Sequence, residues 1–500
     1  MKKCYVFLAL SYFCIGFLSA EEAKNEVKEK AASAEILVHK TVTTNHSVTI
    51  SGQLIDYKAS AGTMVLKDES GKSKAEVFYV SYIKENVKEN NKRPITFCFN
   101  GGPGSSSIWL HMGILGPERV VFDAQGYSAP PYEMVKNDYS LLDMTDLVFI
   151  DPVSTGYSRA AAGEDAKQFH GVEEDVKSIA HFIRLFTTLN LRWDSPKYLA
   201  GESYGTTRAA ALAGHLHDKH FLNLNGIMLI SSVLNFQTIS DPQGGNDLPY
   251  IVFLPSYTAA AWYHNKLDSE LQKDFHKALE EAQTFAETEY TLALMQGNAL
   301  NPKKRQEIVL KLARYTGLTP DYIEGANLRV DNIRFAKELL RKEHRTIGRF
   351  DSRYKGIDSD SNGSSFEYDP SLDSIAGAFT ATFNQYVRAG LKWETDTEYQ
   401  VLTSLGPWDY SKSPNQYLYV GETLRSVMSK NPNLKVFVGS GYYDLATPYF
   451  ATDYTFRHLG LDASLLPNIT MKYYDGGHMM YVQYPELVQL KRDLAEFLKK

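Results

Sequence analysis

The pentapeptide Gly201-Glu202-Ser203-Tyr204-Gly205 constrains the fold of this chain more than any other segment. A short apolar stretch, residues 197–200, precedes it and is typical of a buried strand; the alanine-rich residues 206–216 follow it and favour a helix. A G-x-S-x-G turn between a strand and a helix is a nucleophile elbow, which exposes the serine hydroxyl above a sheet. We therefore predict that Ser203 is a nucleophile. The alternative is a structural turn with an idle serine.

A nucleophilic serine needs a histidine base and an acid that orients the histidine. Residues 434–438 and 469–474 are typical of strands; Asp444 follows the first and His478 follows the second. Both would lie at carboxyl ends of strands, where open α/β sheets carry their sites. We predict His478 as the base and Asp444 as its acid. Asp475, on the same loop as the histidine, is the rival acid.

A glycine-rich turn, Asn100-Gly101-Gly102-Pro103-Gly104, follows the apolar residues 95–99. Backbone N–H groups in such a turn can face a developing oxyanion, and glycine is needed because a Cβ would block the approach. The alternative is an ordinary Gly-Pro turn. Its place upstream of the elbow favours an oxyanion loop.

Taken together, these segments resemble the serine carboxypeptidase family, in the family's order and over roughly residues 95–480. The blocks that carry the resemblance are Asn100-Gly-Gly-Pro-Gly-Ser-Ser-Ser107, Leu147-Val-Phe-Ile-Asp-Pro-Val-Ser-Thr-Gly-Tyr-Ser158, Gly201-Glu-Ser-Tyr-Gly205, Gly441-Tyr-Tyr-Asp444 and Gly477-His478. The resemblance implies an α/β-hydrolase fold with a mixed, mostly parallel sheet flanked by helices. The roles it implies are Ser203 as nucleophile, His478 as base, Asp444 as its partner, the N–H groups of Gly102 and Tyr204 as oxyanion hole, and Asn100, Gly101 and Glu202 as ligands of a peptide's free α-carboxylate.

The implied carboxylate ligands have suitable chemistry. Asn100 offers an amide NH₂ group and Gly101 a backbone N–H, but Glu202 can donate only when it is protonated. Burial beside a substrate carboxylate favours the neutral acid, so we expect peptide binding to improve at acidic pH. A solvated elbow residue is the alternative for Glu202.

The chain departs from the family at three positions. Ile114 stands where many members have a glutamate, so a second acid to share a proton with Glu202 is missing. Cys98 and Ser105 stand where many members have tryptophan and cysteine, so that cysteine's disulfide cannot form. The pattern looks like the bacterial branch of the family rather than the vacuolar enzymes.

The N-terminus predicts export, to a periplasm or to the medium. Residues 1–20 have a basic head, an apolar stretch and small residues before Glu21, as in a secretory signal peptide; an uncleaved anchor is the rival. Residues 21–40 form a charged, mobile lead-in. Of the three cysteines only Cys98 follows the signal, so the mature chain forms no internal disulfide.

The remaining chain is organised as one catalytic domain with an insertion. We expect residues 41–255 and 371–500 to form the two parts of the α/β-hydrolase domain. Residues 256–370 are charged and amphipathic, and four apolar residues recur there at a spacing of four, which predicts a helical cap: Leu267, Leu271, Phe275 and Leu279. The cap would roof the substrate pocket; a surface decoration is the alternative.

Composition narrows the function further. The formal net charge of −6 and the lack of a basic run argue against nucleic-acid partners. No cofactor, metal or stable membrane insertion after signal cleavage is implied, and the expected partners are peptide substrates; the oligomeric state is left open. We therefore expect a serine-type carboxypeptidase. Its rivals are an esterase or acyltransferase with the same triad, and a catalytically silent binding protein.

Overall fold

The computed structural model describes residues 37–89, 92–240, 245–410 and 416–499. The predicted signal peptide and most of the predicted lead-in lie outside this range. The described residues from His39 onward belong to one compact unit. None of the helices in the described ranges is long and apolar enough to cross a bilayer.

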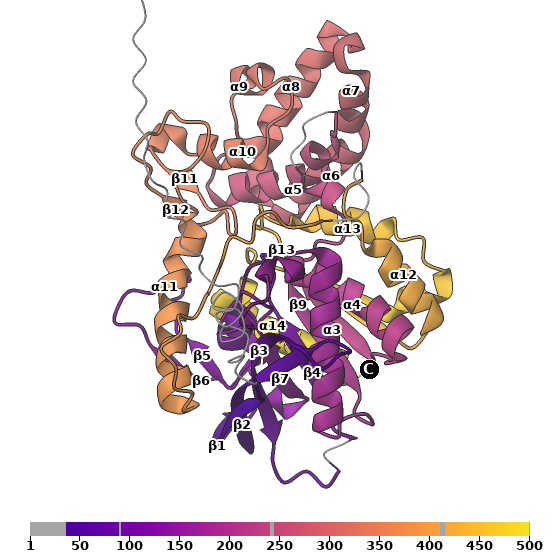
Figure 1. The fold of residues 1–500 in the computed structure, drawn as a ribbon. Helices are drawn as coiled ribbons and strands as arrows, with labels where there is room; N and C mark the ends of the chain where they lie inside the picture. Colours follow the sequence, from indigo (N-terminus) through magenta and orange to yellow (C-terminus); the bar gives the residue numbers. More distant parts are fainter. Residues whose placement is uncertain (1–36, 90–91, 241–244, 411–415, 500) are drawn as a thin grey trace, which may run out of the picture. The chain divides into compact units, whose positions relative to one another are not determined.

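A single large sheet organises this unit (Figure 1). Its strands lie in the order β1-β2-β3-β7-β4-β9-β10-β13-β14, and the short β8 pairs with β3. The strand bounds are β1 Lys40–Ile50, β2 Gln53–Lys67, β3 Ser73–Lys84, β4 Ile95–Phe99, β7 Asp146–Ile150, β8 Arg159–Ala160, β9 Lys197–Glu202, β10 Gly226–Ile230, β13 Lys435–Gly441 and β14 Ile469–Tyr474. Two small ladders lie apart, β5 Glu118–Val120 with β6 Met134–Lys136, and β11 Thr346–Ile347 with β12 Lys355–Gly356.

The sheet is mixed. Strands β1 to β3 form antiparallel hairpins, and β3 pairs antiparallel with β7. From β7 through β4, β9, β10 and β13 to β14 every pairing is parallel. Strands β4, β7 and β10 are buried along their whole length and are almost wholly apolar, as expected for strands covered by helices on both faces. The mostly parallel sheet flanked by helices confirms the predicted α/β class.

Alternate residues of the central strands enter two different cores. Cys98, Ala200 and Met228 pack in one hydrophobic cluster with α14 and α11. Phe97 and Leu199 pack in the other with α3, α4 and α12. The alternation follows from the two-residue repeat of a strand. The helix bounds are α2 Ile108–Leu110, α3 Val172–Leu189, α4 Tyr204–His220, α11 Pro370–Gln385, α12 Gly421–Lys430, α13 Tyr449–Arg457 and α14 Tyr484–Lys499.

Between β10 and β13 the chain forms a helical segment that we call the helical insertion (Figure 1). Its helices are α5 Leu248–Tyr263, α6 Phe275–Phe285, α7 Thr291–Gln296, α8 Pro302–Thr316, α9 Pro320–Gly325 and α10 Asn332–Glu338. They share a hydrophobic cluster with Tyr443, Leu445 and Tyr449, on the chain that follows β13. The insertion therefore packs directly against the segment that carries Asp444.

Two details of the insertion differ from the sequence prediction. The first helix already begins at Leu248, and Pro255 lies inside it. The apolar repeat from Leu267 is not one helix: α6 begins at Phe275, because the Asp274 side chain accepts a hydrogen bond from the backbone N–H of Lys277 and caps it. The repeat continued through a turn that periodicity alone does not detect. The boundaries 256 and 370 for a cap remain a prediction.

Candidate active site

Strand β9 runs directly into Ser203, and α4 begins at the next residue. Ser203 has φ 59° and ψ −131°, a strained conformation for a residue with a side chain. A Cβ on Gly201 would collide with the carbonyl group of Gly205, so the turn closes only with glycine there. The Ser203 N–H donates to the carbonyl of Ile230 at 3.0 Å, which ties the turn to β10. The local geometry is that of a nucleophile elbow.

The loops after β13 and β14 bring an acid and a histidine together. His478 Nδ1 and Asp444 Oδ2 lie 2.7 Å apart, and both side chains are buried. Thr447 donates its hydroxyl to Asp444 Oδ2 at 2.7 Å, and the N–H groups of Ala446 and Thr447 donate to Oδ1 at 2.7 and 2.9 Å. Asp475, the rival acid, is exposed. Of the two acids, the structure places Asp444 against the histidine.

In the buried pair of Asp444 and His478, each residue stabilises the charged form of the other. Burial raises the pKa of the Asp444 carboxyl, but the His478 ring and the hydrogen bonds lower it by more, so the net pKa lies below its usual value. Burial likewise lowers the pKa of His478, but Asp444 and Glu202 raise it by more, so its net pKa lies above 6.5. A proton received by His478 is therefore stabilised by neighbouring carboxylates.

Ser203 and His478 line one cavity of about 210 Å³, which we call the central cavity. Among the described residues no hydrogen bond joins the serine hydroxyl to the histidine ring, a bond that is often long in unliganded enzymes. Asp444 and Tyr204 are buried outside the lining. The full lining is Asn100, Gly101, Gly102, Ser105, Trp109, Glu202, Ser203, Arg349, Phe350, Leu372, Leu402, His478 and Met479.

The glycine-rich turn packs tightly on the elbow. A Cβ on Gly101 would collide with the backbone nitrogen of Tyr204, and Gly102 has φ 101°, which favours glycine. The backbones of the turn and of the helix start therefore come together beside Ser203. This is the kind of juxtaposition that an oxyanion hole requires.

Glu202 is the last residue of β9, directly before Ser203, and its side chain is buried. The Asn100 amide donates to its Oε1 at 2.8 Å, and the Tyr481 hydroxyl donates to its Oε2 at 2.7 Å. Burial raises the pKa of Glu202 to about 7, an effect that the His478 ring and these two donors oppose. The carboxyl group can thus be protonated near neutral pH, unlike a solvated glutamate.

Sequence reasoning did not find Tyr481. Its ring packs against the π-helical segment His111–Leu115, which contains Ile114; a Cβ on Gly113 would collide with the ring. Tyr481 thus gives Glu202 a buried partner near the position where Ile114 replaces the glutamate of many family members. Tyr481 lies 279 residues from Glu202 along the chain, and no local spacing signals such a contact.

Two further anchors were also missed. Arg208 on α4 pairs with Asp175 on α3 at 2.7 Å, and it also donates to the backbone carbonyl of Asn100. Asp151 accepts the N–H of Ser107 at 2.8 Å, which anchors the chain after the glycine-rich turn. Both anchoring side chains are buried, and both bind backbone groups of the chain around the glycine-rich turn. Neither composition nor periodicity of the sequence signals such contacts.

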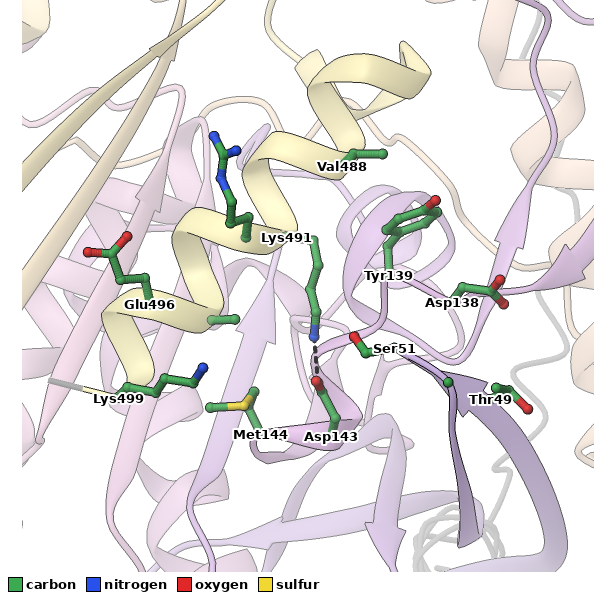
Figure 2. A pocket seen from close by; sticks show the side chains of 13 residues that line it. Thr49, Ser51, Asp138, Tyr139, Asp143, Met144, Val488, Lys491, Glu496 and Lys499 are labelled. Atoms are coloured by element: carbon green, nitrogen blue, oxygen red, sulfur yellow. Dashed lines mark hydrogen bonds and ion pairs between the residues drawn. The ribbon is translucent and has the colours of Figure 1, made fainter.

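A larger cavity of about 580 Å³ lies elsewhere, between α14, the β1–β2 turn and the 3-10 turn Leu141–Asp143. Figure 2 shows Lys491 of α14 reaching Asp143 across it. Its lining has no histidine or cysteine and none of the predicted site residues. Its size alone therefore does not make it the active site.

The sheet, the elbow and the buried acid–histidine pair define an α/β-hydrolase of the serine type. Consistent with that fold, the structure matches Kex1(delta)p, a prohormone-processing carboxypeptidase from Saccharomyces cerevisiae, with a TM-score of 0.56 and 16% identity, over 88% of this chain and 91% of that one. The chain belongs to the serine carboxypeptidase family, whose sequence profile it matches over residues 52–488.

Curated relatives are similar over shorter stretches. Serine carboxypeptidase-like 36 of Arabidopsis thaliana is 26% identical over 193 residues, which is 37% of each chain. Carboxypeptidase Y homolog A of Paracoccidioides lutzii is 25% identical over 205 residues, 41% of this chain and 33% of that protein. The aligned part thus spans about a third of the length of these relatives.

Proposed function

We propose that the protein is a serine carboxypeptidase that releases the C-terminal amino acid of a peptide through an acyl-enzyme on Ser203. One observation carries the proposal: the central cavity combines Ser203 and His478 with Asn100 and a buried Glu202. A hydrolase of simple esters has no need of a proton-donating acid beside its nucleophile. A free α-carboxylate does need such donors.

The proposed reaction has two steps. His478, oriented by Asp444, takes the proton of Ser203 as the hydroxyl oxygen attacks the last peptide carbonyl. The backbone N–H groups of Gly102 and Tyr204 hold the oxyanion. The C–N bond then breaks, and His478 gives the proton to the leaving amino group. Water, deprotonated by His478, next attacks the ester carbonyl and frees the peptide acid and the Ser203 hydroxyl.

The carboxylate clamp, namely Asn100, Gly101 and Glu202, would hold the leaving residue. Asn100 Oδ1 accepts the N–H of Leu110 at 3.1 Å, which fixes the amide so that its NH₂ group faces Glu202. A protonated Glu202 can donate to the substrate carboxylate, whereas an ionised one repels it. The raised pKa of Glu202, about 7, supports a preference for acidic to neutral pH.

The cellular setting is part of the proposal. We place the enzyme outside the cytoplasm, periplasmic or secreted, on the features of residues 1–20, and in the bacterial branch of the family, on Ile114, Cys98 and Ser105. Peptides are the proposed substrates. An esterase or acyltransferase with the same triad is the alternative, and the buried clamp weighs against it.

The test compares an N-blocked dipeptide with the same dipeptide amidated at its C-terminus, between about pH 4 and pH 8. We expect release of the terminal amino acid from the free acid alone, and loss of this release in Ser203→Ala. Equal turnover of acid and amide, or turnover of simple esters only, would overturn the carboxypeptidase proposal.

A further inference from the structure

The segment Arg349–Phe350 is hydrogen-bonded to two loops. The acid loop follows β13 and carries Asp444, and the histidine loop follows β14 and carries His478. The N–H groups of Arg349 and Phe350 each donate to the Asp369 carboxylate at 3.2 Å. The Arg349 carbonyl accepts the N–H of Leu445, next to Asp444, at 2.9 Å, and the Phe350 carbonyl accepts the N–H of His478 at 2.6 Å. These four hydrogen bonds fix the backbone of Arg349 and Phe350 beside both loops.

The Arg349 side chain lines the central cavity together with Ser203 and Glu202. Its guanidinium lies 5.2 Å from the centre of the Phe350 ring, and within the described residues no carboxylate lies within ion-pair distance of it. Arg353, four residues further on, is paired with Asp351 at 2.6 Å. A partly buried cation without a counter-ion is unfavourable, and an anionic ligand would relieve that cost.

The carboxylates that line the two cavities beside Arg349 are bound by other residues and do not serve as its counter-ion. Arg349 also lines a second cavity of about 400 Å³ under α5, whose one lining carboxylate, Asp331, is paired with Arg334 at 3.4 Å. In the central cavity the lining carboxylate is Glu202, which is bound by Asn100 and Tyr481. Arg349 thus lines the substrate space, and no side chain or backbone group in the described part of the chain accepts a hydrogen bond from its guanidinium.

We propose that Arg349 binds the side-chain carboxylate of an acidic C-terminal residue, so that the enzyme prefers peptides ending in glutamate or aspartate. This inference rests on the proposed carboxypeptidase function. The leaving residue would lie in the central cavity, with its α-carboxylate at the clamp and its scissile carbonyl at Ser203. Its side chain would pass the apolar lining, Trp109, Leu372 and Met479, and reach Arg349, which offers a carboxylate two donors.

The rival role for Arg349 is to hold the α-carboxylate itself. The two roles differ in what a neutral side chain at position 349 would do. If Arg349 holds the α-carboxylate, Arg349→Gln slows every free-acid peptide by the same factor. If Arg349 binds the side chain, only peptides with an acidic terminal residue are slowed.

The experiment measures kcat/KM of the full chain on N-blocked dipeptides that end in glutamate or glutamine, with a second pair carrying this difference at the penultimate residue. We expect the glutamate-ended peptide to be favoured about tenfold or more, because a charge-assisted pair is gained. Arg349→Gln should bring the ratio to about one without slowing the glutamine-ended peptide. Arg349→Glu should favour a lysine-ended peptide instead.

Arg345→Gln is the matched control, since Arg345 lies four residues before Arg349, donates to the carbonyl of His344 and does not line the cavity. It should keep the wild-type ratio. The inference is overturned by a wild-type ratio near one, by an equal loss on all peptides in Arg349→Gln, or by a preference confined to the penultimate residue. Failure to cleave even the glutamine-ended acid would overturn the proposed function itself.

Discussion

At the scale of single residues, we expect Glu202 to set how the proposed peptidase responds to pH. Its buried carboxyl has two effects of opposite sign on catalysis: when neutral it can donate to a substrate carboxylate, and when ionised it raises the pKa of His478. His478 must be neutral to act as a base, so ionisation of Glu202 also makes the base harder to deprotonate. Peptide turnover is therefore favoured where Glu202 is still protonated and His478 is not.

Tyr481 tunes this balance. Its hydroxyl donates to Glu202, which stabilises the ionised form and lowers the pKa that burial raises to about 7. In Tyr481→Phe the donor is lost, so the pKa of Glu202 rises. We expect the basic limb of the kcat/KM profile for a free-acid peptide to move to higher pH by about 0.5 to 1 unit.

Tyr484→Phe is the control for this shift. Tyr484 is half exposed and contacts Tyr139 rather than Glu202, so its loss should leave the profile in place. Turnover of an ester without a free carboxylate should also keep its basic limb in Tyr481→Phe. An unchanged basic limb for the peptide, or a limb moved to lower pH, would contradict the assigned role of Tyr481.

At the scale of elements, helices α3 and α4 hold the clamp in place through one buried ion pair. Arg208 is bound to Asp175 and also donates to the backbone carbonyl of Asn100. Asp175→Asn leaves the Arg208 charge buried without its counter-ion. We expect the free energy of unfolding to fall by about 3–5 kcal/mol, measured by urea denaturation.

The matched control is Glu173→Gln on the same helix. Glu173 pairs with Lys177 at 3.2 Å, and both side chains are about half exposed, so we expect a change below about 1 kcal/mol. A similar small loss in Asp175→Asn would show that the buried pair does not support the two helices. Retained stability with lost peptide turnover would place its role in the clamp alone.

Most elements that carry the site were predictable because each has a strong local signal. Strand β14 has the predicted bounds, and strands β9 and β13 begin within one residue of their predicted starts. The start of α6 was not predictable from the four-residue repeat. The repeat begins at Leu267, but the helix begins only at Phe275, where Asp274 caps it. Local apolar patterns thus predict that a helix or strand is present, whereas capping side chains determine the residue at which a helix begins.

At the scale of the whole molecule, the sequence showed in which order the site motifs follow one another along the chain. It could not show which side chains that are distant in sequence come into contact. Ser203, Asp444 and His478 follow the order of an α/β-hydrolase triad, so the three could be proposed together from the sequence. Tyr481 and Arg349 could not, because their contacts depend on how the loops after β13 and β14 fold back over the elbow. Such contacts follow from tertiary packing and leave no pattern in a single sequence.

The helical insertion and the sheet domain should unfold as one unit, because they share the hydrophobic cluster that contains Tyr443 and Leu445 beside Asp444. Phe335 is fully buried in this cluster and stacks on Tyr257 with ring centres 4.1 Å apart.

In Phe335→Ala we expect the free energy of unfolding to fall by about 3–5 kcal/mol, with far-UV dichroism and ester turnover lost in the same urea transition. Leu310→Ala, at a half-exposed position of α8, should cost less than about 1 kcal/mol. Two separate transitions, with turnover surviving the first, would instead show that the insertion folds independently of the acid loop.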